Sequence, residues 1–196
     1  MHHYRQADKP MKKLLESNSL ILTEAAIVER LRRSRKIVLN EHVIHANLIY
    51  NKHGRETIKK IYSEYIDVAF DAGVPFLMCT QTWRTSKERV DIARCSPDIN
   101  IYAAHYLKEL RKTYRPNEGI IQIGGLISCK NDCYKPEEAL TAEEADTYHA
   151  WQIDQLVQGG VDFLFGTTLP EVHEAEGIAQ AMSRTKLHYI ISFVIN

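Results

Sequence analysis

The chain alternates short apolar segments with longer amphipathic ones, and this order constrains its fold more than any other feature. The segment VPFLMCTQT (74–82) is a continuous apolar run, which is typical of a strand buried on both faces. The segment before it, 55–73, repeats apolar side chains at helical spacing and reaches Gly73, which predicts the end of a helix. Such an alternation predicts a parallel sheet covered by helices.

The same alternation continues to the end of the sequence. Helices are predicted over 98–114, 141–160 and 170–184, and the second begins with Thr141 and Glu144 at the spacing of a capping box. The predicted strands end near Thr23, Thr80, Gly125, Gly166 and Phe193.

Two architectures agree with this order of elements: an open, doubly wound sheet and part of an eight-stranded βα barrel. An open sheet that binds nucleotides has a glycine-rich first turn, whereas the first turn here, LTEAAIVE (22–29), contains no glycine. This disfavours the open sheet, which stays as the alternative. The first residues are polar, so the sequence divides into an N-terminal segment, 1–19, and a βα domain, 20–196.

The charge balance argues against a nucleic acid or an anionic membrane as the partner. Lys and Arg together number 25, and so do Asp and Glu, so no net field attracts a polyanion. No apolar run is long enough to cross a bilayer, and the N-terminus MHHYRQADKPMKK lacks the hydrophobic centre of a secretory signal. We therefore expect a cytoplasmic protein whose cysteines are reduced.

Cysteine and histidine spacings do not predict a metal site. Cys129 and Cys133 are separated by three residues, but two cysteines alone cannot complete a zinc site, which usually has three or four protein ligands. His42 and His45 are a second possible pair, and no third ligand lies near them in the sequence. Free thiols in a loop are therefore favoured for the two cysteines.

Polar residues at the predicted strand ends are the candidates for a binding site. In βα barrels and open α/β sheets, ligands bind at the carboxyl ends of the strands. Threonines also end strands for structural reasons, because they are β-branched and cap turns. No catalytic residue is singled out by spacing. The candidates for substrate contact are Thr23, Glu24, Thr80, Gln81, Thr82, Gly125, Thr167, Thr168 and Ser192.

Five segments, taken in order, resemble the homocysteine S-methyltransferase family. The run GGVDFLFGTTLPEVHEAEGIAQAM (159–182) is similar to the family's fourth strand, its Thr-apolar-Pro turn and the next helix. LILTEAAIVERL (20–31) resembles the first strand and helix, and IYSEYIDVAFDAGVPFLMCTQTW (61–83) resembles the second helix and strand. IIQIGGLI (120–127) and YIISFVI (189–195) resemble the third and fifth strands.

The resemblance covers about Leu20 to Asn196. It implies a TIM-type barrel, here incomplete, with about five parallel strands and flanking helices. It also implies methyl transfer to a small amino acid or thiol such as homocysteine, the reaction that forms methionine in its biosynthesis. In the family a zinc ion binds the thiol and lowers its pKa, so the nucleophilic thiolate exists at neutral pH. The methyl donor is a sulfonium, a quaternary ammonium, or a pterin or corrinoid carrier, and these alternatives stay open.

Three departures from the family pattern bear on activity. The zinc cysteines of the family follow its sixth and eighth strands, and none of the cysteines here matches them. Thr23 replaces the Asp that ends the first strand, with Glu24 beside it, and Thr167 replaces the Glu that ends the fourth. A hydroxyl group can orient a substrate, but it cannot balance an ammonium group as a carboxylate does. We therefore predict no catalytic zinc and no methyl transfer to homocysteine by these 196 residues alone.

Two alternatives stand beside the enzyme. One is a divergent, non-catalytic relative that binds a small amino acid or a methyl-carrier partner, and the other is an unrelated open-sheet α/β binding protein. A sheet of five strands also has two unpaired edges, and its last strand, 189–195, is uncharged and apolar on both faces. Such an edge pairs readily with another chain, so we expect self-association through 188–196.

Overall fold

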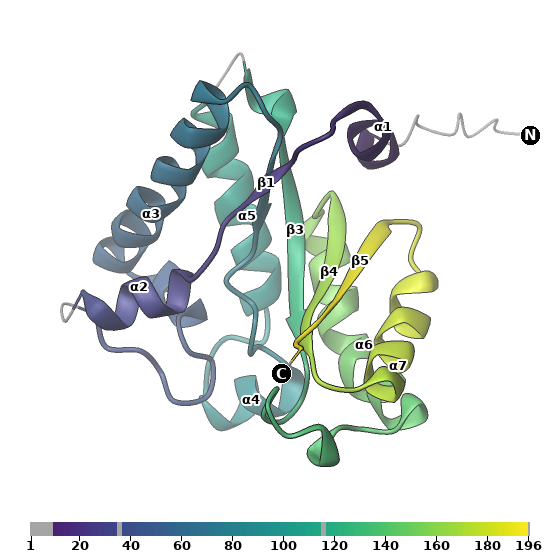
Figure 1. Ribbon diagram of the computed structural model, residues 1–196. Coiled ribbons are helices and arrows are strands. Elements are labelled where there is room, and N and C mark those ends of the chain that lie inside the picture. Colours follow the sequence, from purple (N-terminus) through teal and green to yellow (C-terminus); the bar gives the residue numbers. More distant parts are fainter. Residues whose placement is uncertain (1–9, 35–36, 115–116, 196) are drawn as a thin grey trace, which may run out of the picture.

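Five parallel strands lie side by side in one sheet, in the same order as in the chain (Figure 1). The structure, a computed structural model, describes residues 10–34, 37–114 and 117–195. The strands are β1 (Leu22–Thr23), β2 (Phe76–Cys79), β3 (Ile121–Ser128), β4 (Phe163–Leu169) and β5 (His188–Phe193). The helices are α1 (Pro10–Ser17), α2 (Ile27–Arg33), α3 (Lys52–Asp71), α4 (Lys87–Ile92), α5 (Ile99–Lys112), α6 (Ala142–Gly159) and α7 (Val172–Ser183). Short 3-10 helices are η1 (Ala46–Tyr50), η2 (Asn117–Ile120) and η3 (Pro136–Glu138).

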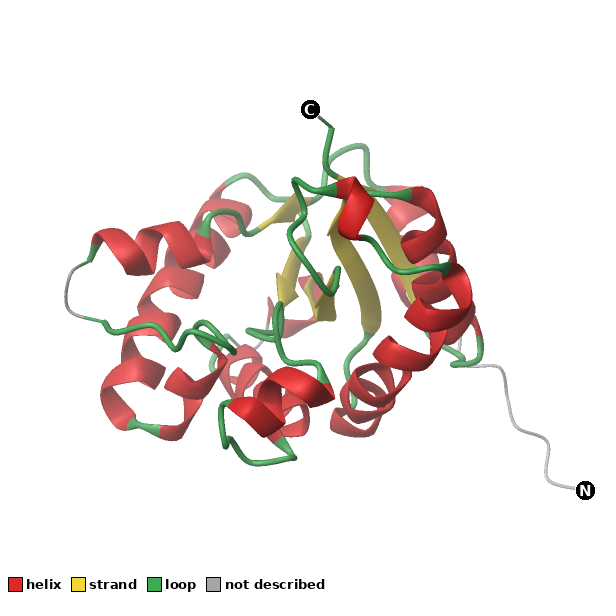
Figure 2. Cartoon of the chain, turned by 90° about the horizontal axis from the view of Figure 1, so that it is seen from below, coloured by secondary structure: helices red, strands yellow, loops and turns green. Residues whose placement is uncertain are grey.

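The consecutive strand order identifies the sheet as part of a βα barrel. Neighbouring strands are parallel, with Thr23 of β1 beside Leu77 of β2 and Ser128 of β3 beside Thr167 of β4. A doubly wound sheet reverses its strand order at a switch point, and no reversal occurs among the described strands. The sheet curls into a half-barrel with helices along its outer side (Figure 2). The predicted incomplete TIM-type barrel is confirmed.

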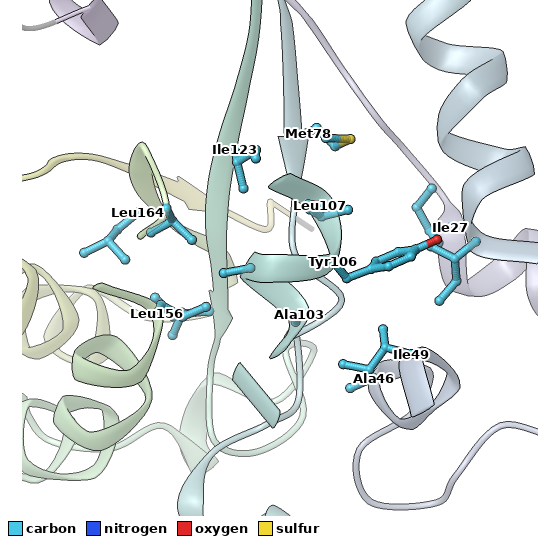
Figure 3. Close-up of a cluster of buried hydrophobic side chains, with 14 of the residues drawn as sticks. Ile27, Ala46, Ile49, Met78, Ala103, Tyr106, Leu107, Ile123, Leu156 and Leu164 are labelled. Carbon is cyan, nitrogen blue, oxygen red and sulfur yellow. The ribbon is translucent and has the colours of Figure 1, made fainter. Parts of the chain in front are cut away.

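The main core lies between the outer face of the sheet and the helices. Met78, Ile123 and Leu164 contribute to it from β2, β3 and β4 (Figure 3). Leu107 of α5 and Leu156 of α6 meet them from the other side. Full burial of one such side chain stabilises the fold by about 1.5–3 kcal/mol. This layer therefore fixes the helices on the sheet, and with them the loops that leave the strand ends.

A second, smaller cluster covers the inner face of the sheet. It combines Leu77, Cys79 and Phe163 of the strands with Met11 and Leu14 of α1. In Figure 1, α1 lies near the ends at which the strands begin, so it covers the amino end of the half-barrel. The predicted division at residue 20 places α1 outside the βα domain. That division stays a prediction, and the packing of α1 favours counting residues 10–19 with the sheet.

Local signals in the sequence are confirmed at the helix ends. Thr141 and Glu144 form the capping box of α6: the Thr141 side chain accepts from the Glu144 N–H at 3.3 Å, and Glu144 accepts from the Thr141 N–H at 3.0 Å. Gly73 follows α3 with a φ of 65°, and Gly160 follows α6 with a φ of 75°. Glycine adopts this left-handed conformation without strain, so it ends both helices.

Two strands are longer than predicted. β3 continues past Gly125 to Ser128, and β4 continues past Gly166 to Leu169. Glycine is depleted in strands, which is why the sequence pattern placed strand ends at these residues. Gly125 instead allows close packing inside β3, because a Cβ there would lie 3.1 Å from the Leu156 side chain of α6.

Parts of two predictions fall outside the described residues. These are residues 1–9 of the polar N-terminal segment and Asn196 at the end of the expected contact segment. Among the helices that the structure describes, none is both long and apolar enough for a membrane span.

Candidate functional site

A cavity of about 550 Å³ lies at the carboxyl ends of the strands. Its wall combines residues that follow β1 with residues at the ends of β2, β3 and β4 and in the loop after β3. The lining residues are Thr23, Glu24, Ala25, Ala26, Ile27, Val28, Glu29, Arg32, His45, Tyr62, Cys79, Thr80, Trp83, Leu126, Tyr134, Phe165, Thr167 and Thr168. This is the end of a βα barrel at which ligands bind, and the volume suits a small molecule.

Glu24 brings a carboxyl group to the end of β1. Its Oε1 accepts a hydrogen bond from the backbone N–H of Cys79 at 3.0 Å, which ties it to the end of β2. Burial raises the pKa of Glu24 to about 7, and this N–H opposes the shift. Glu29, the other acidic lining residue, is paired with Arg33 at 3.1 Å. Glu24 is therefore the carboxyl group that can change from neutral to ionised when a cation binds near neutral pH.

Three further ionisable side chains in the wall are held in their neutral forms. Burial lowers the pKa of His45 to about 4, and its Nδ1 has no hydrogen-bond partner within the described residues. The Tyr62 hydroxyl donates to the Cys79 carbonyl at 2.6 Å, and burial raises the pKa of Tyr62 well above 10. Burial also raises the pKa of the Cys79 thiol well above 9. None of these three groups carries a charge at neutral pH, and the lining residues Glu29 and Arg32 pair with each other at 3.6 Å.

The threonines after β2 form a closed hydrogen-bond network. The Thr80 hydroxyl accepts from the Leu126 N–H at 3.0 Å and lies 2.6 Å from the Thr82 hydroxyl, which donates to the Leu126 carbonyl at 2.7 Å. Gln152 of α6 donates to the Thr82 carbonyl at 2.7 Å. Each hydroxyl proton is therefore already used, and these groups fix the turn that carries Trp83 rather than offering donors to a ligand.

At the end of β4, the two threonines of the GTT sequence both face the cavity. Strand residues normally alternate between faces, but the pairing of β4 with β5 shifts register between Gly166 and Leu169. Thr168 has a φ of 52°, which β-branched residues rarely adopt. This bulge places Thr167 and Thr168 together in the cavity wall.

The structure brings together five of the nine candidate residues. Those that line the cavity are Thr23, Glu24, Thr80, Thr167 and Thr168. Gln81 and Thr82 are fully buried behind the wall, and Gly125 faces α6. Ser192 lies on β5 outside the cavity lining.

Sequence reasoning missed several lining residues because they arrive through long-range packing. Tyr62 lies in the segment 55–73, whose spacing predicts only a helix, and its hydroxyl reaches the end of β2. Tyr134 comes from the loop after β3, and no periodic signal marks it. The apolar strand pattern could have indicated Phe165, since it lies two residues before Thr167 on the same face of β4.

The described residues do not fit the zinc site that the resemblance implies. No three His, Cys, Asp or Glu side chains come together in 10–34, 37–114 and 117–195. The Cys129 thiol is buried and donates to the Asn131 carbonyl at 3.4 Å. Burial raises the pKa of both Cys129 and Cys133, whereas zinc binds the thiolate. No step through zinc follows from these side chains.

Fold and cavity together define a βα-barrel protein with a cavity of small-molecule size at its strand ends. Comparison with known families narrows this class, because the family model described as homocysteine S-methyltransferase matches residues 11–196. The chain belongs to the homocysteine S-methyltransferase family. A search of curated proteins gives no match.

Solved structures of the homocysteine methyltransferase MmuM from Escherichia coli share the fold. The metallated form has a TM-score of 0.77 at 17% identity, the oxidized form 0.79 at 17%, and the apo form 0.68 at 19%. Each match covers 95% of this chain, but only 67%, 66% and 64% of the respective MmuM chains. This chain therefore spans about two thirds of the length of these structures.

Proposed function

We propose that this chain is the substrate-binding part of a homocysteine S-methyltransferase-like barrel, and that its cavity binds a small amino acid or thiol such as homocysteine. The position of Glu24 carries the proposal. Its carboxyl group lies in the cavity at the end of β1 and is held by the Cys79 N–H. The resemblance expects an acid at the adjacent position, Thr23, so Glu24 supplies that group from one residue further along.

The raised pKa of Glu24 is consistent with a role in binding the ammonium group of an amino acid. A cation within about 4–6 Å favours the ionised form of a carboxyl group. Because the pKa of Glu24 is about 7, binding of an amino acid and ionisation of Glu24 are coupled. We expect the affinity for an amino acid to fall as the pH drops below about 7, since a protonated Glu24 cannot balance the ammonium charge.

Calorimetric titration with L-homocysteine tests this proposal. Glu24→Gln should weaken binding by about tenfold or more, because a hydrogen bond to a charged group contributes about 1.5–3 kcal/mol. It should also remove the pH dependence. Glu176→Gln, an exposed change on α7, is the matched control and should leave the affinity unchanged. Equal affinity of wild type and Glu24→Gln across the pH series would show that the site lies elsewhere.

A non-catalytic relative is the second candidate function, and one observation favours it. Thr167 stands where the resemblance expects a Glu, and a hydroxyl group cannot balance an ammonium charge. We therefore expect no methyl transfer to homocysteine by these 196 residues alone. The test is formation of methionine from homocysteine with sulfonium, quaternary ammonium and methylpterin donors. Chain-dependent methionine formation would refute this alternative and support the enzyme.

Three further proposals concern the setting of the protein. We propose a cytoplasmic location, because all the cysteines are free thiols and a reducing compartment preserves them. A role in methionine biosynthesis follows if the full activity is methylation of homocysteine. The third proposal is that copies of the chain associate through the edge of β5, the last strand of the sheet.

A further inference from the structure

The bulge at the end of β4 leaves a specific set of hydrogen-bond donors in the cavity. The Thr168 hydroxyl donates to the Thr167 carbonyl at 2.7 Å and lies 3.0 Å from the Ser128 hydroxyl, so Ser128 donates to it. The Trp83 indole N–H also points at Thr168 Oγ1, at 3.4 Å. The capacity of Thr168 is therefore filled, and this strained residue positions its neighbours.

Two groups beside Thr168 keep capacity for a ligand. The Thr167 hydroxyl has no hydrogen-bond partner in the described part of the chain, and Thr167 lines the cavity. The Trp83 N–H is a donor only, and its 3.4 Å contact is longer than the usual 2.9–3.0 Å. The β4 side of the cavity therefore offers donors and suits a ligand group that accepts hydrogen bonds.

Charge is distributed unequally across the same cavity. The Arg84 guanidinium lies 4.9 Å from the centre of the Trp83 ring, on the side of the cavity that carries Thr167. Three backbone carbonyls, those of residues 129–131, hold it there at 2.8–3.3 Å. Glu24 lies at the end of β1, three strands away in the sheet order. Glu29 and Arg32 also line the cavity, in the helix that follows β1, and they pair with each other at 3.6 Å. Apart from this pair, the cavity has a carboxyl group, that of Glu24, in one wall and the Arg84 guanidinium behind the other.

We propose that the cavity holds a zwitterionic amino acid in one orientation, with its ammonium group at Glu24 and its carboxylate at the Thr167 hydroxyl and the Trp83 N–H. This deepens the proposed function and rests on it. In this orientation Thr167 does not take over the role of the Glu that the resemblance expects at its position. Its hydroxyl instead donates a hydrogen bond to the carboxylate of the ligand.

Three probes separate the two ends of the ligand. L-Homocysteine has both charged groups, 3-aminopropane-1-thiol lacks the carboxylate, and 4-mercaptobutanoic acid lacks the ammonium group. Binding of each to the full 196-residue chain is measured by calorimetry, for wild type and for Thr167→Val, which removes the hydroxyl at nearly constant volume. Thr167→Val should weaken homocysteine and mercaptobutanoate by about tenfold and leave the aminothiol unchanged. Glu24→Gln should show the reverse pattern, weakening homocysteine and the aminothiol only.

Two companion variants keep the test decisive. Thr167→Ser retains the hydroxyl and should bind all probes nearly as wild type does. Trp83→Phe retains a ring and removes the N–H, the second proposed donor to the carboxylate. It should therefore weaken homocysteine and mercaptobutanoate and leave the aminothiol unchanged, and it replaces Thr167→Val as the test if that variant does not fold. If Thr167→Val weakens the binding of homocysteine and of the aminothiol equally, the proposed orientation is wrong, whereas the proposed function stands. The same conclusion follows if Thr167→Val changes the affinity for none of the probes. Absence of binding of every probe to wild type would overturn the proposed function itself.

Discussion

Glu24 carries a proton-linked charge in the cavity wall, and this links folding stability to pH. Its pKa is about 7 in the folded protein, against a reference value of 4.5. Between these values the folded protein binds more protons than the unfolded chain, so the contribution of Glu24 to stability falls as the pH rises from about 4.5 to about 7. Glu24→Gln should therefore stabilise the protein by about 1–3 kcal/mol at pH 8 and change little near pH 4.

Urea unfolding at the two pH values measures this difference. His45 acts in the opposite direction, because its folded pKa of about 4 lies below the reference value of 6.5, so its contribution rises with pH over that range. Comparison of each variant with wild type at the same pH cancels this background. Glu176→Gln should show no pH-dependent difference. A Glu24→Gln variant that is equally destabilised at both pH values would contradict the raised pKa.

At the scale of elements, the contact between α6 and α7 depends on one small residue. Gly177 lies in α7, where an added Cβ would press against the Ala142 carbonyl oxygen and lie 2.7 Å from the Ala145 Cβ. Both atoms belong to the first turn of α6, which the capping box holds in place. Gly177→Ala should therefore destabilise the protein by about 1–3 kcal/mol through overpacking, although alanine favours a helix by about 1 kcal/mol over glycine.

Thermal or urea unfolding decides this prediction, and the chain offers a matched control. Gly119 is exposed, and no atom lies within 4 Å of a Cβ built there. Gly119→Ala should shift stability by less than about 0.5 kcal/mol. If Gly177→Ala is as stable as Gly119→Ala, the helices are less closely packed than the structure has them.

Elements with strong periodic or capping signals could be predicted from the sequence, and those shaped by neighbours could not. The pattern of 55–73 predicted α3, and the Thr141–Glu144 spacing predicted the start of α6, because both signals are local. The ends of β3 and β4 were predicted too early, at Gly125 and Gly166. Both glycines lie inside their strands because neighbouring side chains pack closely against them. The general rarity of glycine in strands therefore does not mark the strand ends here.

For the whole molecule, the order of elements predicted a parallel sheet, and the family resemblance predicted that this sheet is part of a barrel. The strand ends predicted where the cavity lies. The composition of its wall could not be predicted. His45 arrives from a segment with no clear period, and the bulge that turns both Thr167 and Thr168 inward depends on pairing with β5. The strand-end rule therefore locates a site, whereas the contacts between distant segments decide which side chains enter it.

The open edges of the half-barrel differ in their capacity to pair. β1 has two residues, whereas β5 has six. Among the described strands, β5 is hydrogen-bonded to β4 alone. The segment 189–195 carries no charge, and the side chains of Phe193 and Ile195 are 45% and 91% exposed. A second copy that pairs β5 with β5 about a twofold axis would cover both edges at once.

We predict that the 196-residue chain associates through β5, and sedimentation across a concentration series measures it. Phe193→Lys should weaken association by placing a charge at the exposed end of the edge strand. Ile191 is a poorer choice, because it packs against the main core and a lysine there would impair folding. Val68→Lys is the matched control, since Val68 is 56% exposed on α3 and lies away from β5, and it should leave association unchanged. A wild-type chain that stays monomeric at high concentration would refute pairing through this edge.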